Sequence, residues 1–76
     1  MMADEKKVLR LLKTARGQMD GIIKMVEENR YCIDISQQLM ATEAILNRAN
    51  KEILAAHLKH CVLEAASDAE RGQKIH

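Results

Sequence analysis

The sequence lacks phenylalanine, tryptophan and proline, and it contains a single tyrosine among its 76 residues. With no proline and only three glycines, little in the chain interrupts a helix. The large apolar side chains are Leu, Ile, Met and Val, in a background of Ala, Glu, Lys, Arg and Gln, which favours helices and gives little support for strands. We therefore predict an all-α chain that forms one domain over residues 1–76.

Long apolar runs and catalytic motifs are missing as well. No stretch approaches the roughly 20 apolar residues of a membrane-spanning helix, and no signal-peptide pattern is present. There is no Ser/His/Asp set, phosphate-binding loop or facing pair of carboxylates, so the sequence predicts neither a membrane protein nor an enzyme. We expect a reduced, cytoplasmic protein, in which two cysteines indicate a metal or redox site rather than a structural disulfide.

Apolar residues at helical spacing predict a first helix over about residues 5–28. Asp4 is its candidate N-cap, and residues 29–30 end it. Gly17 and Gly21 lie inside this helix, four residues apart, and we interpret them as a small-residue spot where another helix packs closely. The short connection that follows predicts an antiparallel second helix.

The second predicted helix covers about residues 31–66, which contain neither Gly nor Pro. Residues 67–70 read Ser-Asp-Ala-Glu, the Ser-x-x-Glu form of a capping box, and predict a short third helix over about residues 68–73. A helical hairpin of this length leaves an apolar stripe uncovered, so we expect an obligate oligomer.

The candidate site consists of Cys32, His57 and Cys61. His57 and Cys61 are four residues apart and share one helix face, which suits two ligands of one metal ion. Cys32 lies 25 positions before His57, about 37 Å along a continuous helix, so the three residues cannot meet within one straight helix. In an antiparallel pair of copies crossing near residues 45–46, position 32 of one copy faces position 59 of the other. Cys32 of one copy then meets His57 and Cys61 of the other, so each dimer contains two such sites.

Two thiolates and one imidazole form a soft, three-coordinate set. Such a set suits Cu(I) and leaves Zn(II) short of a fourth ligand. His60 is a further candidate, either as that fourth ligand for Zn(II) or Ni(II), as a contact to the ligands, or as an exposed side chain. Three alternatives stay open: a buried Cys61 as a small apolar residue, His57 as a surface or interface residue, and oxidation of Cys32 and Cys61 to an intersubunit disulfide. We assign no role to His76.

A basic segment stands out although the formal net charge is only +1. Residues 6–16 contain no acid, and on a helix Lys6, Arg10 and Lys13 fall in a narrow stripe with Arg16 at its edge. Repetition in an oligomer would make a strongly positive surface, suited to salt-sensitive contacts with DNA phosphates. The alternative is an ordinary solvated helix face. No helix-turn-helix pattern is present.

Three segments resemble the copper-sensing operon repressors: Arg16-Gly17-Gln18-Met19-Asp20-Gly21-Ile22, Tyr31-Cys32-Ile33-Asp34 and His57-Leu58-Lys59-His60-Cys61-Val62. These proteins form one branch of an all-helical family that also has nickel/cobalt, formaldehyde and persulfide-sensing branches. The similarity runs over about residues 6–66. The nickel/cobalt branch has His at the position of Cys61, the formaldehyde branch lacks this Cys, and the persulfide branch lacks the His, so the copper branch matches best.

The resemblance implies a dimer of antiparallel hairpins, a four-helix bundle, with two dimers joined as a homotetramer. It also implies Cu(I) held by Cys32 of one subunit with His57 and Cys61 of the other, Tyr31 as a neighbour of the ligands, and Arg48 as a DNA contact. The resulting hypothesis is a repressor whose metal-free form binds operator DNA and is released by Cu(I). The alternatives are the same scaffold sensing Ni(II), Zn(II) or thiol oxidation, and a metal carrier that binds no DNA.

Overall fold

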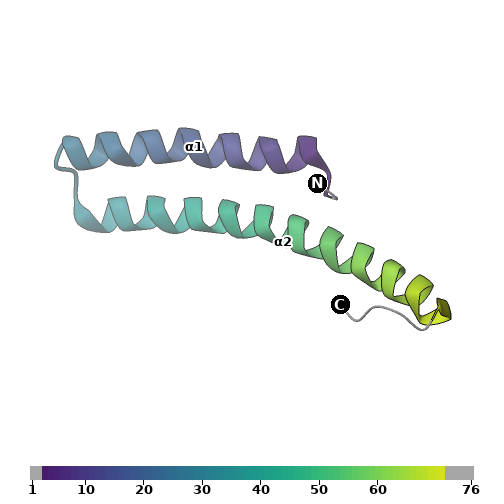
Figure 1. The fold of residues 1–76 in the computed structure, drawn as a ribbon. Helices are drawn as coiled ribbons and strands as arrows, with labels where there is room; N and C mark the ends of the chain where they lie inside the picture. Colours follow the sequence, from purple (N-terminus) through teal and green to yellow (C-terminus); the bar gives the residue numbers. More distant parts are fainter. Residues whose placement is uncertain (1–2, 72–76) are drawn as a thin grey trace.

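The computed structural model describes the backbone of residues 3–71 and their side chains, except those of His60 and of residues 64–71. This part of the chain forms two helices, α1 (Glu5–Glu27) and α2 (Cys32–Arg71), and no strand. The helices run antiparallel and lie side by side along the length of α1, while α2 continues beyond it (Figure 1). The predictions of an all-α fold and of a helical hairpin are confirmed.

Asp4 caps the start of α1, as predicted. Its backbone is extended, and its carboxylate Oδ1 accepts a hydrogen bond of 3.2 Å from the backbone N–H of Lys7. This bond satisfies one of the donors that the first turn of a helix leaves unpaired. Glu5 follows in the first turn, where a negative charge is favoured by the helix dipole.

The turn between the helices is closed by Asn29, which has a φ of 54°. Asparagine tolerates this left-handed conformation better than most residues other than glycine. The Asn29 N–H donates to the Val26 carbonyl and the Arg30 N–H to the Met25 carbonyl, both at 3.0 Å. This pair of bonds is the Schellman arrangement that ends a helix, and it confirms the predicted end of α1.

The predicted third helix is wrong where the structure can test it, because residues 68–71 continue α2 without a break. Residues 72–73 lie outside the described part of the chain. A capping box begins a helix only where the preceding backbone has left the helical conformation. Neither Gly nor Pro stands between Cys32 and Arg71, so the backbone hydrogen bonds run on past Ser67.

The core between the two helices is small. Its buried apolar side chains, among the described residues, are Val8, Leu11, Ala15, Ile22 and Ala49; Cys61, further along α2, is also buried. The radius of gyration is 18.6 Å, against about 11 Å for a compact domain of this length. Many large apolar side chains therefore stay in contact with solvent in the single chain, in agreement with the predicted uncovered stripe.

One buried polar contact fixes how α1 lies against α2. Thr42 of α2 is only 3% exposed, and its hydroxyl donates to Gln18 Oε1 on α1 at 2.8 Å while lying 3.1 Å from the Gln38 carbonyl. Sliding one helix along the other would leave this hydroxyl without its partner on α1, so the contact favours a single register.

Gly17 and Gly21 do not mark a close contact between α1 and α2. A Cβ atom built on either glycine would meet nothing within 4 Å. Our interpretation of these glycines as a packing spot is therefore wrong within the single chain.

Candidate metal centre and nucleic-acid interface

His57 and Cys61 form a pair on α2, one helical turn apart. The Cys61 Sγ atom lies 3.4 Å from His57 Nε2. Cys61 is buried and His57 is half-buried. The helix itself creates the pair, because residues four apart stand one above the other on the same face.

The distance within this pair suits two ligands of one metal ion. Bond lengths of about 2.0 Å to nitrogen and about 2.3 Å to sulfur, typical of zinc, would place the two atoms about 3.5–3.7 Å apart around a shared ion. A change of a few tenths of an ångström in the 3.4 Å separation is enough to reach this range. Within the described residues of the single chain, no third Cys, His, Asp or Glu joins them to complete a metal-binding group.

Cys32 is exposed and begins α2. Because α2 is one continuous helix from Cys32 past Cys61, the two cysteines lie about 43 Å apart along its axis. A single chain therefore presents one part of the candidate site at each of two distant places on α2, as the spacing predicts.

Tyr31 and His60 are the other residues expected near the proposed ligands. Tyr31 immediately precedes α2, where its carbonyl accepts a hydrogen bond from the Ile35 N–H, and its side chain is exposed. The side chain of His60, the candidate fourth ligand, lies outside the described part of the structure, as does His76.

The five predicted DNA-contacting residues are all exposed; they are Lys6, Arg10, Lys13, Arg16 and Arg48. Three of them, Lys6, Arg10 and Lys13, lie together on α1 around a shallow surface hollow that Leu9 and Thr14 complete. We call these three residues the basic stripe. Arg16 lies outside the hollow, and Arg48 is on α2.

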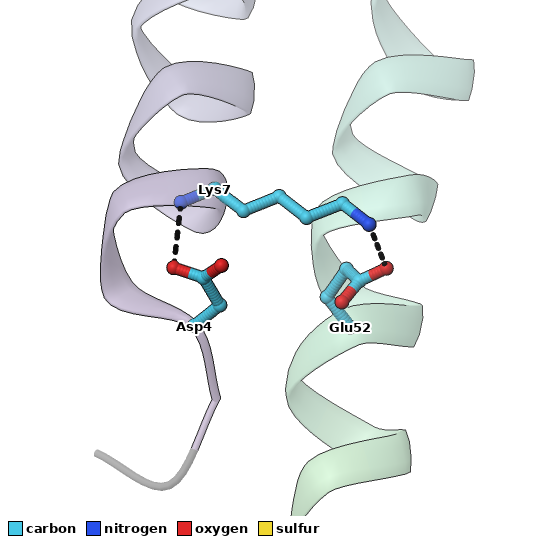
Figure 2. A network of polar contacts seen from close by, with 3 residues as sticks. All are labelled: Asp4, Lys7 and Glu52. Atoms are coloured by element: carbon cyan, nitrogen blue, oxygen red, sulfur yellow. Dashed lines mark hydrogen bonds and ion pairs between the residues drawn. The ribbon is translucent and has the colours of Figure 1, made fainter.

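An ion pair that joins the two helices was not predicted from the sequence. The Lys7 ammonium group reaches across from α1 to the Glu52 carboxylate on α2, with 2.8 Å between Nζ and Oε1 (Figure 2). A signal for it exists in the sequence, because opposite residues of an antiparallel hairpin lie equally far from the turn. Lys7 and Glu52 are equidistant from the turn at residues 29–30, and they carry opposite charges.

The profile of a family described as "Metal-sensitive transcriptional repressor" matches residues 4–76. This chain belongs to that family. The description names transcriptional repressors rather than enzymes, in agreement with the prediction of a non-catalytic protein.

Several relatives carry the name "Copper-sensing transcriptional repressor CsoR". The chain is 47% identical to the one from Mycobacterium ulcerans over 73 residues, which are 95% of this chain and 62% of that protein. It is 40% identical to the one from Mycobacterium tuberculosis over 68 residues, 90% of this chain and 57% of that protein. The Bacillus subtilis protein is 35% identical over 72 residues, 95% of this chain and 71% of the relative.

The chain thus spans about three fifths of the length of the two mycobacterial relatives, at 62% and 57%. No solved structure matches the chain at a significant level. Within the described residues, neither helix is long and apolar enough to cross a membrane.

Proposed function

We propose that this protein is a Cu(I)-responsive transcriptional repressor, which binds operator DNA without metal and is released when Cu(I) binds. The observation that carries the proposal is the His57–Cys61 pair, which offers one nitrogen and one sulfur 3.4 Å apart on a helix of this family. The names of the relatives support copper as the metal that is sensed. A repressor at operator DNA works in the compartment that holds the DNA, which fits the expected cytoplasmic location.

A homodimer would complete the site. Cys32, Leu39, Leu46 and Ile53 follow one another at intervals of seven along α2, and residues at this spacing form one stripe along a helix. Leu39 and Leu46 are exposed in the single chain, so the stripe is available to a partner. Two copies packed antiparallel about a two-fold axis near residues 45–46 would bring Cys32 of each copy opposite the turn between His57 and Cys61 of the other.

Cu(I) fits the combined ligand set better than Zn(II) or Ni(II) does. Cys32, His57 and Cys61 together supply two sulfurs and one nitrogen, and Cu(I) accepts low coordination with soft ligands. Zn(II) in a protein ordinarily takes four ligands, so it would need a further donor such as His60. Titration with each metal distinguishes these cases.

The proposed contact with DNA relies on the exposed basic stripe. Phosphate contacts from Lys and Arg supply affinity that weakens with salt, and a homotetramer made of two dimers would repeat the stripe four times. Arg16 and Arg48 would add further positive charge. Release by Cu(I) then requires that metal ligation and DNA binding favour different arrangements of the subunits. The free-energy difference that results is the coupling between the metal site and the DNA site.

A titration of the protein with Cu(I) under anaerobic conditions tests the proposal. The DNA probe is a fluorescein-labelled duplex that the wild-type protein selects from a randomised library. We expect about one Cu(I) per subunit and a loss of fluorescence anisotropy as the duplex is released. The Cys32→Ala variant should bind the duplex as wild type does and should keep it when Cu(I) is added.

Three results would contradict the proposal in different ways. A protein that selects no duplex would be a metal carrier. Release by Zn(II) or Ni(II) but not by Cu(I) would identify a different metal sensor. Release by an oxidant without metal, with a disulfide between subunits that joins Cys32 to Cys61, would identify a thiol sensor.

A further inference from the structure

The contact between Lys7 and Glu52 joins the two helices near the place where α1 begins. Within the described part of the chain there are two ion pairs, and the other, Arg30 to Glu28 at 3.9 Å, lies at the turn and does not join the helices. The Lys7 backbone is itself held by the Asp4 cap, so Asp4, Lys7 and Glu52 form a continuous polar bridge from the start of α1 to α2 (Figure 2).

On α1, the bridge ends within the basic segment. Lys7 follows Lys6 directly and precedes Arg10 by three residues, so it lies in the same helical turns as the basic stripe. Its own charge is directed to Glu52 and not to the hollow that the stripe surrounds. A helix moves as a rigid element, and a shift of Lys7 relative to α2 would therefore move Lys6 and Arg10 with it.

On α2, the bridge ends close to the metal ligands. Glu52 precedes His57 by five residues, about 7.5 Å along the axis. A surface hollow of about 440 Å³ connects the start of α1 with this part of α2, and its lining includes Asp4, Glu52, Ala56 and Lys59. Beyond this level α2 continues without α1 beside it (Figure 1). The ion pair thus lies at the boundary between the part of α2 that runs beside α1 and the part that extends beyond α1, which holds Cys61.

We propose that the Lys7–Glu52 ion pair is a positioning contact that transmits metal ligation on α2 to the DNA-binding face of α1. This inference rests on the function proposed above. Ligation of His57 and Cys61 in a site shared with another subunit would fix the part of α2 beyond α1 against that subunit. This displaces Glu52, at the edge of that part, and through the ion pair Glu52 pulls Lys7 and the basic stripe with it. Metal ligation and DNA binding would each change the position of this ion pair, and coupling between two sites requires an element that both can move.

The size of the effect follows from the exposure of the pair. Both side chains are more than one third exposed, and exposed ion pairs are weak because water and salt screen them. One such pair can change an equilibrium by about two- to fivefold. Typical coupling between two sites is about 5- to 150-fold, so this contact supplies part of the response and not the whole of it.

The test compares operator binding with and without Cu(I), by anisotropy of the labelled duplex that the wild-type protein selects. The measured quantity is the dissociation constant for the duplex with Cu(I) divided by the one without Cu(I). It is determined for wild type, E52Q, K7Q and the double variant. We expect the ratio to fall by about two- to fivefold in each single variant and no further in the double variant, because both remove the same contact. The K7R variant keeps the charge and should restore most of the ratio. E28Q, which breaks the ion pair at the turn, is the matched control and should retain the wild-type ratio.

The ratio separates a positioning role from a merely structural one. A general loss of stability or of phosphate attraction lowers both affinities by the same factor and leaves the ratio unchanged. A wild-type ratio in E52Q would therefore overturn the role of the ion pair while leaving the proposed function intact. A wild-type protein whose affinity for the duplex is insensitive to Cu(I) would overturn both.

Discussion

Mixing two inactive variants gives the sharpest prediction about the metal site. Cys32→Ala removes the ligand at the start of α2, and Cys61→Ala removes one ligand near its other end. Each variant alone should lose high-affinity Cu(I) binding, because every site in its homodimer lacks one sulfur. A mixed dimer, however, unites the intact Cys32 of one subunit with the intact His57 and Cys61 of the other.

The expected recovery can be worked out from the geometry. The two cysteines of one chain lie about 43 Å apart along α2, so they cannot ligate one ion. In a random one-to-one mixture of the two variants, a site is complete when one subunit supplies Cys32 and the other supplies Cys61. Each condition is met half the time, so about one quarter of the wild-type number of sites should return in a symmetric assembly.

The measurement is a Cu(I) titration against a chelator of known affinity, on each variant and on their mixture after unfolding and joint refolding. Circular dichroism provides the control for folding. Cys32 is exposed, so its loss should hardly affect stability, whereas loss of the buried Cys61 side chain should cost about 1 kcal/mol. A mixture that binds no more Cu(I) than the separate variants would refute the shared site. Full binding by Cys32→Ala alone would remove Cys32 from the site altogether.

Three further variants test other parts of the structure. Gly21→Ala should raise the free energy of unfolding by about 0.5–1 kcal/mol in denaturant titrations, because a Cβ there meets nothing within 4 Å; a loss of stability would place a neighbour against this face. Thr42→Val should lower the same free energy by about 1 kcal/mol, since the hydrogen bond to Gln18 is lost; an unchanged midpoint would show that the bond contributes nothing. Arg10→Gln should make the plot of log affinity for DNA against log salt less steep, by about 0.9 for each phosphate contact that is lost; an unchanged slope would remove Arg10 from the interface.

The hairpin could be predicted from the sequence because its signals are local. Asp4 at the start of α1 and Asn29 after its end each act on the backbone within a few residues, and the structure shows both in the expected roles. The capping box at residues 67–70, by contrast, led to a wrong prediction of a third helix. Its pattern is local too, but it takes effect only after a break in the helix, and nothing between Cys32 and Ser67 provides one.

The contacts between the helices were harder to predict, because they depend on register as well as on spacing. Once the turn is placed at residues 29–30, Lys7 must lie near Glu52 and Gln18 near Thr42, since each pair is about equally far from the turn. The contact between His57 and Cys61 was predictable from a spacing of four residues. The two cysteines of one chain lie about 43 Å apart along α2, so under the proposed function Cys32 joins that pair from a second subunit.

The unequal lengths of the helices favour the proposed assembly. α2 has 40 residues and α1 has 23, so within residues 3–71 a large part of α2 has no other helix beside it. Near the ligands, Leu58, Val62 and Leu63 are 62%, 65% and 63% exposed, respectively. An uncovered helical segment gains little from packing, and in proteins packing supplies most of the stability of a helix. A partner that covers these side chains would therefore also hold His57 and Cys61 in place while bringing its own Cys32. Under the proposed function, oligomerisation and metal binding therefore stabilise each other, and both stabilise the second half of α2.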